Sequence, residues 1–232
     1  MHLSSQNVNI KLSVQSISRD FSGSAFFVWS CEKYRRLSKC LKSNCMSILR
    51  GVYLENNYKG GAKMDLTSQR LVFRFYEAND FDFLYSMLND SEMMKYIGNG
   101  NTRNTEEALA FLERIQSHYK QNEEFGLKLL VRKEDGIPIG HAGIIPQQID
   151  GKEELEIGYW IAKEFWGNGY ATEAAKALLN RAINKLGIHR LISLIQTDNT
   201  RSGRVALKNG MQLEKEIILK GKSVSLYTYK SQ

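Results

Sequence analysis

A glycine-rich turn links an expected strand to an expected helix, and this link limits what the chain can become. Residues 166–172 read Trp-Gly-Asn-Gly-Tyr-Ala-Thr. Apolar side chains alternate over residues 155–161 and recur at helical spacing over residues 172–186. Glycine allows positive φ angles and close approach of a ligand to the backbone. The first N–H groups of a helix lack intrahelical partners, so the turn predicts a phosphate-binding site.

Two common phosphate-binding patterns do not fit this turn. A P-loop would continue as Gly-Lys-Ser/Thr, and a dinucleotide-binding fold would show G-x-G-x-x-G. Neither follows the strand at residues 155–161. The ligand therefore belongs to another class of phosphate-containing molecule.

The turn resembles the pyrophosphate-binding pattern Gln/Arg-x-x-Gly-x-Gly/Ala of the GNAT N-acetyltransferase superfamily. Gly169 and Ala171 fill its last two fixed positions, and Trp166 stands where Gln or Arg is usual. Residues 199–211 and 96–100 are similar to segments of the Rim-type ribosomal-protein N-terminal acetyltransferases. The resemblance runs from about residue 69 to residue 229.

Periodicity predicts an α/β (α+β) domain over residues 64–232, with the order β-α-α-β-β-β-α-β-α-β-β. The resemblance implies the GNAT fold, a mixed central sheet of about seven strands with helices on both faces. One helix should begin after Asn104, because Glu107 completes a capping box. A strand should lie between Pro138 and Pro146, and Gly187 should end the helix of residues 172–186.

Charge divides the chain near residue 63. Residues 1–63 hold 10 Lys/Arg and 3 Asp/Glu, whereas residues 64–232 hold 22 of each. A neutral domain gives no electrostatic reason to expect a nucleic-acid partner. We expect residues 1–63 to be a basic leader, either disordered or translated upstream sequence with Met64 as the true start. A targeting segment is the alternative, since the leader is Ser-rich and poor in acids.

The cysteines also separate leader from domain. Cys31, Cys40 and Cys45 lie in the leader at a spacing that fits no zinc site, so no metal is expected. The domain contains no cysteine, which suits a cytoplasmic location and excludes an acyl-cysteine intermediate. No apolar run reaches the ~20 residues of a membrane span, so no membrane partner is expected.

The resemblance implies acetyl-CoA as cosubstrate. Backbone N–H groups of the turn would hold the pyrophosphate, the fourth strand would pair with the pantetheine arm, and Asn199 would bind that arm. Arg204 and Lys208 either reach the 3′-phosphate or form a solvated helix face, which we favour. The predicted cofactor-binding residues are Trp160, Ile161, Ala162, Gly167, Asn168, Gly169, Tyr170, Ala171, Thr172, Asn199 and Ser202.

Without an acceptor cysteine, a primary amine would attack the thioester directly. Glu156 is the predicted general base, because it lies on the fourth strand and faces away from the Leu155/Ile157 core; the alternative is a structural carboxylate. Many family members carry a Tyr acid where this chain has Ala206, and Ser202 is the predicted substitute. His141 is either a second base or a structural residue, which we favour.

The resemblance implies an acetyl-CoA-dependent N-acetyltransferase acting on a protein N-terminus or a small-molecule amine. The missing Tyr leaves a different class open, a catalytically weak acyl-CoA-binding module. The acceptor site would lie between the first helices and the last hairpin. There the chain offers Asn99, Asn101, Arg103 and a Lys-Gly-Lys turn at residues 220–222, which name no substrate. The protein would be a monomer or a homodimer.

Overall fold

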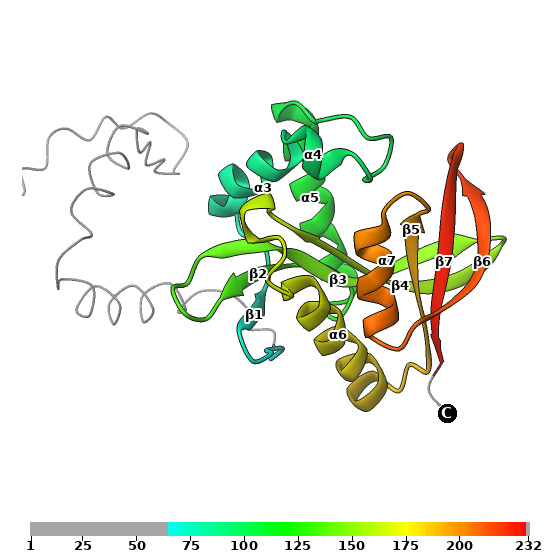
Figure 1. Cartoon of the computed structure of the whole chain (residues 1–232). Coiled ribbons are helices and arrows are strands. Elements are labelled where there is room, and N and C mark those ends of the chain that lie inside the picture. Colours follow the sequence, from blue (N-terminus) through cyan, green and yellow to red (C-terminus); the bar gives the residue numbers. More distant parts are fainter. Residues whose placement is uncertain (1–64, 231–232) are drawn as a thin grey trace, which may run out of the picture. The chain divides into compact units, whose positions relative to one another are not determined.

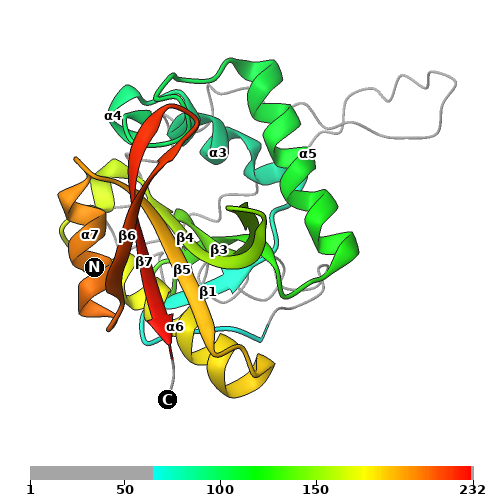
Figure 2. The same ribbon diagram turned by 90° about the vertical axis from the view of Figure 1, so that its right-hand side faces the viewer.

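The computed structural model of the protein describes residues 65–230 (Figure 1). The expectations for residues 1–63 lie outside the described residues. Within them, the chain forms one central sheet flanked by helices on both faces (Figures 1 and 2). The strands are β1 (Leu71–Arg74), β2 (Gly126–Arg132), β3 (Pro138–Ile149), β4 (Lys152–Ile161), β5 (Arg190–Gln196), β6 (Gln212–Leu219) and β7 (Lys222–Lys230).

The four predicted helices form in the predicted order, with three short additions. The helices are η1 (Ala78–Asp80), α3 (Phe81–Leu88), α4 (Ser91–Met94), α5 (Thr105–Gln121), η2 (Lys163–Phe165), α6 (Tyr170–Leu186) and α7 (Thr200–Lys208). The additions are η1, α4 and η2. The four-residue helix α4 was not predicted, because a single turn is too short to show periodicity. Asp90 caps it by accepting hydrogen bonds from the backbone N–H groups of Glu92 and Met93.

The sheet confirms the predicted mixed topology. Its strand order is β1-β2-β3-β4-β5-β7-β6, and only β4 and β5 run parallel to each other. These two strands pair at one position, Glu156 with Ile192, whereas β4 and β3 pair from Gly140–Ile161 to Ile149–Lys152. β4 and β5 therefore separate beyond Glu156, and the β5-facing edge of β4 is left without a neighbouring strand.

Two apolar cores hold the helices against the sheet. On one face, α6 packs Ala174, Leu178 and Ala182 against the sheet. On the other face, α3 and α5 pack Leu84 and Phe111 against β2. The small alanines bring α6 close to the sheet, which fixes the position of the turn that precedes it.

Two details differ from the sequence predictions. Pro146 does not end β3 but lies within it, paired with Leu155, and the strand continues to Ile149. Lys128 is fully buried on β2, where only alternating apolar residues had been recognised. Its ammonium donates a 2.7 Å hydrogen bond to the Phe125 carbonyl, and burial lowers its pKa to about 7. Because both faces of β2 are covered, its long apolar stem is buried together with the charge.

The predicted cap of α5 provides a test of local stability. Asn104 accepts a hydrogen bond from the Glu107 N–H, and the Glu107 carboxylate accepts one from the Asn104 N–H, both 2.9 Å. Asn104→Ala removes the first bond and should lower the free energy of unfolding by ~1 kcal/mol. Urea unfolding measures the change, and Asn101→Ala is the matched control on an exposed side chain. Equal free energies of unfolding for the two variants would contradict the role of Asn104 as the cap of α5.

Candidate active site

A cleft of about 990 Å³ opens where β4 and β5 separate. Its walls come from β4, the turn before α6, the end of β5, the start of α7 and the segment after α4. Of the residues predicted to bind the cofactor or catalyse the reaction, the cleft wall contains Glu156, Trp160, Ile161, Gly167, Gly169, Tyr170, Ala171, Thr172, Asn199 and Ser202. Segments up to about a hundred residues apart are therefore brought to one place by the fold.

The free edge of β4 is centred on Tyr159. The Ile157 carbonyl accepts a 2.9 Å hydrogen bond from Ser193 Oγ, and the Ile161 carbonyl accepts a 2.6 Å bond from Trp166 Nε1. Backbone groups alternate in direction along a strand, so Tyr159, between these two residues, also points its N–H and carbonyl toward the cleft.

This geometry corrects part of the predicted strand contact. The Ala162 N–H donates a 2.9 Å hydrogen bond to the Ile139 carbonyl, and Trp160 pairs with His141 on β3. The backbone groups of Ala162 and Trp160 therefore point toward β3 and not toward the cleft. Of the three residues predicted for this contact, only Ile161 presents a backbone group to the cleft, because the sequence shows side-chain alternation without showing which backbone groups the neighbouring strand uses.

The turn before α6 presents unpaired backbone donors. Gly169 has a φ of 80° and provides no side-chain cap. The N–H groups of Tyr170, Ala171 and Thr172 in the first turn therefore have no intrahelical acceptor. The Asn168 side chain braces the turn by donating to the carbonyls of Phe165 and Trp166, at 3.1 and 3.2 Å. The turn is thus a rigid loop with three N–H groups available to an anion.

Arg70 and Glu173 lock the turn onto the start of β1. The Glu173 carboxylate accepts hydrogen bonds from Ser68 Oγ, the Arg70 N–H and Arg70 Nε, at 2.6–2.7 Å. Arg70 also donates a 3.1 Å bond to the Asn168 carbonyl, and its guanidinium lies 4.4 Å from the centre of the Tyr170 ring. This pair leaves no local signal in the sequence, because its members are 103 positions apart.

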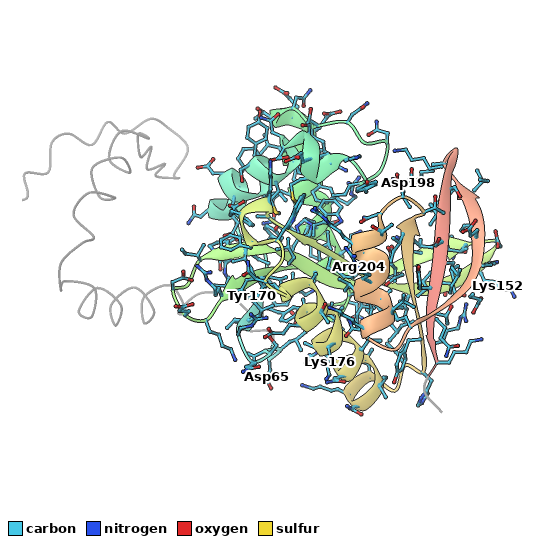
Figure 3. The ribbon with its side chains drawn as sticks, viewed as in Figure 1. Asp65, Lys152, Tyr170, Lys176, Asp198 and Arg204 are labelled. Carbon is cyan, nitrogen blue, oxygen red and sulfur yellow. The ribbon has the colours of Figure 1, made fainter. Side chains whose placement is uncertain are left out.

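Helix α7 supplies polar and basic groups to the other wall. Asn199 caps the helix by accepting a 3.2 Å hydrogen bond from the Ser202 N–H, so its side-chain oxygen serves the helix. Arg201, Arg204 and Lys208 all line the cleft and are spaced three and four residues apart, on one face of α7. Figure 3 labels Arg204 on this helix. These three side chains are exposed to solvent, as expected for Arg204 and Lys208, and they also border the cleft.

The position that the resemblance aligns with a tyrosine is a buried alanine in this chain. Ala206 is buried against Ile195 and Met211. A tyrosine hydroxyl instead reaches the first turn of α7 from β4, where Tyr159 Oη donates a 3.1 Å hydrogen bond to the Ser202 carbonyl. Burial raises the pKa of Tyr159, which keeps this phenol protonated.

Glu156 lies at the point where β4 and β5 part. It is partly buried, lines the cleft and accepts a 2.6 Å hydrogen bond from Gln147 Nε2. Burial raises the pKa of its carboxyl, although the bonds from Gln147 and from the Leu194 N–H oppose the rise. The side chain is therefore a stronger base than an exposed glutamate.

His141 is a structural residue. It is fully buried, its Nδ1 lies 2.8 Å from Tyr76 Oη, and its ring centre is 4.5 Å from that of Trp160. Burial lowers its pKa to about 3, so it stays neutral. His141 does not line the cleft, which excludes it as the base.

These features fit a ligand with a pyrophosphate and an amide-rich arm. The turn offers three backbone donors, and the free edge of β4 offers the N–H and carbonyl of Tyr159 and the N–H of Ile161. Within residues 65–230, no group of His, Cys, Asp and Glu side chains is arranged to hold a metal ion. No helix in the same range combines the length and apolarity needed to cross a membrane.

Comparison with known proteins agrees with this geometry. Residues 70–212 match the family model described as Acetyltransferase (GNAT) domain. YkkB of Bacillus subtilis is 36% identical over 174 residues, 73% of this chain and 98% of its own. The ribosomal-protein-serine acetyltransferase of Escherichia coli is 36% identical over 59 residues, 25% of this chain and 33% of its own.

A solved structure shares the fold over most of the described domain. The GNAT-family acetyltransferase from Bacillus anthracis superimposes with a TM-score of 0.61 at 25% identity, covering 72% of this chain and 98% of that one. The Rim-type resemblance is consistent with the ribosomal-protein acetyltransferase among the relatives. The chain therefore belongs to the GNAT acetyltransferase family and is an acetyl-CoA-dependent acetyltransferase.

Proposed function

We propose that the protein transfers the acetyl group of acetyl-CoA to a primary amine by direct attack, with Glu156 as general base. The observation that carries this proposal is a partly buried carboxylate of raised pKa at the point where β4 and β5 separate. Bound acetyl-CoA supplies the acetyl thioester. Its pyrophosphate would lie on the N–H groups of Tyr170, Ala171 and Thr172, and its arm along Tyr159 and Ile161.

The acceptor amine must lose a proton before it attacks. An α-amino group of pKa ~8 is about one-tenth neutral at pH 7, which costs ~1.4 kcal/mol, whereas a lysine of pKa ~10.4 costs ~4.6 kcal/mol. Glu156 would accept this proton through the cleft. A carboxylate of raised pKa suits the first task better than the second, so the proposal favours a polypeptide N-terminus or another weakly basic amine.

The departing sulfur needs a hydrogen-bond donor. The first turn of α7 carries two hydroxyl side chains, those of Thr200 and Ser202. We propose Ser202 Oγ for this role, with Tyr159 as a positioning residue that holds the Ser202 backbone. Ala206 leaves the usual tyrosine position empty of a donor. This absence supports a second candidate function, an acyl-CoA-binding module with little catalytic power.

An amine panel separates the two candidate functions. Acetyl-CoA is incubated with the protein and with peptides or small amines, and release of free thiol is followed. Thermal shift reports cofactor binding in the same samples. Stabilisation with thiol release for at least one amine supports the acetyltransferase, whereas stabilisation without release across the panel supports the binding module.

The role of Glu156 predicts a specific pH dependence. A base acts when ionised, so kcat/KM should rise with pH through the raised pKa of Glu156, above the ~4.3 of an exposed glutamate. Glu156→Gln should lower kcat by ~10²–10⁴ and abolish that rise. Acetyl-CoA affinity should stay unchanged. Glu153→Gln, on an exposed carboxylate of the same strand, is the control; an unaltered pH profile in Glu156→Gln would remove Glu156 from the mechanism.

The turn predicts a separate loss of binding. At Gly169, φ is 80°, and an added Cβ would stand 3.7 Å from Arg70 Nη2. Gly169→Val would strain this backbone, displace the donors and weaken acetyl-CoA binding by ~100-fold or more, about 2.7 kcal/mol. Calorimetry measures the affinity. Gly151→Val is the control, since Gly151 has a φ of 74° in open space between β3 and β4; wild-type affinity in Gly169→Val would refute this placement of the pyrophosphate.

A further inference from the structure

The segment after α4 and the β6–β7 hairpin meet at the end of β5. Gln196 Nε2 donates a 3.0 Å hydrogen bond to the Tyr96 carbonyl, and the Thr197 N–H donates a 3.3 Å bond to the Ser223 carbonyl. Both ribbon views show the hairpin tip beside the segment that follows α4 (Figures 1 and 2). One end of the cleft is therefore bordered by two segments more than a hundred residues apart.

Two lysines, Lys95 and Lys222, lie at this border, and Lys220 stands two residues before Lys222 at the start of the same hairpin turn; we call the three the basic rim. Lys95 lines the cleft, and its ammonium lies 5.1 Å from the Tyr96 ring centre. The Lys222 ammonium lies close to Gly100. If Gly100 carried a Cβ atom, that atom would be 3.4 Å from Lys222 Nζ and 3.4 Å from the Lys95 carbonyl oxygen. The Lys222 ammonium thus lies against the segment that carries Lys95, and Lys220 begins the same hairpin turn.

The basic rim carries unneutralised positive charge. Among residues 65–230, the lysines that form ion pairs are Lys163, Lys215 and Lys230. The carboxylates lining this end of the cleft are Glu92, which pairs with Lys163, and Asp198 (Figure 3). The ammonium groups of Lys95 and Lys222 therefore meet one unpaired carboxylate, Asp198, at this end of the cleft, in a domain whose charges otherwise balance. Such a local excess selects negatively charged ligands.

The distance from Glu156 to the basic rim sets the size of the ligand. Glu156 pairs with Ile192, and Gln196, which holds the segment after α4, lies four residues further along β5. At ~3.3 Å per residue this is ~13 Å, far more than the separation of the amine and carboxylate in one amino acid. An extended peptide with its amine at Glu156 would place its third to fifth side chains at the basic rim.

We propose that the acceptor is a polypeptide N-terminus with acidic side chains at its third to fifth positions, which the basic rim binds. The proposal rests on the proposed function, because it names the acceptor of the site around Glu156. Glu156 receives the amine at one end of the cleft, and the basic rim receives the carboxylates at the other.

Paired peptides test this inference on the full-length chain. Two eight-residue peptides with a free α-amine carry either Glu or Gln at positions three to five, and thiol release from acetyl-CoA is measured. The Glu peptide should show about tenfold higher kcat/KM, ~1.4 kcal/mol, mainly through a lower KM. The preference should shrink at high ionic strength, because Lys95 and Lys220 are exposed to solvent and Lys222 is partly exposed.

Variants assign the preference to the basic rim. Lys222→Ala and Lys95→Ala should each reduce the preference about threefold while leaving acetyl-CoA affinity and the rate with the Gln peptide unchanged. Lys222→Gln keeps the length of the side chain and should behave in the same way. Lys152→Ala, at the exposed start of β4 (Figure 3), is the control and should keep the full preference.

The outcomes distinguish this inference from the proposed function. Equal kcat/KM for the two peptides, or faster transfer to a polyamine such as spermidine than to the Glu peptide, would overturn the acidic-peptide acceptor and leave amine acetylation intact. Equal loss with both peptides in the lysine variants would overturn the assignment to the basic rim. No thiol release with any amine would overturn the proposed function and this inference together.

Discussion

The parting of β4 from β5 is the constraint on which the rest of the site depends. The two strands run parallel but pair only between Glu156 and Ile192. Beyond that pair, Tyr159 and Ile161 keep backbone groups for a ligand, and the carboxylate of Glu156 faces the same opening. Had the strands stayed paired, their hydrogen bonds would have used these groups and closed the cleft. In the proposed function, cofactor binding and catalysis therefore both depend on this one interruption of the strand pairing.

Side chains hold this interruption open. Ser193 binds the Ile157 carbonyl at 2.9 Å, and Trp166 binds the Ile161 carbonyl at 2.6 Å, so the two ends of the open edge are satisfied. Arg70 and Glu173 then fix the turn that faces this edge. Trp166 stands where the family usually has Gln or Arg, and here its indole N–H ties the turn to β4. An aromatic residue therefore supplies a structural hydrogen bond at this position.

The sequence predicted features whose signal is local. Asn104 and Glu107 are three residues apart, and the capping box forms as expected. Gly187 ends α6 with a φ of 65°. The sequence could not show that Ala162 binds Ile139 or that Arg70 reaches Glu173, because these contacts depend on strand register and on chain segments far apart. The prediction that Pro146 ends β3 was wrong for the same reason. Proline has no backbone N–H, so it fits inside a strand only where neither neighbouring strand needs that donor, and strand register decides this.

The two ends of the cleft offer different chemistry to the ligands proposed for them. At the turn, backbone N–H groups of Tyr170, Ala171 and Thr172 face the ligand, and a substitution there changes the donors only if it changes the backbone. At the other end, Lys95 is exposed and Lys222 is partly exposed, so one substitution there should remove a charge with little effect on the fold. In the proposed function, cofactor binding therefore depends on backbone geometry, whereas the choice of acceptor depends on side chains that single substitutions can change.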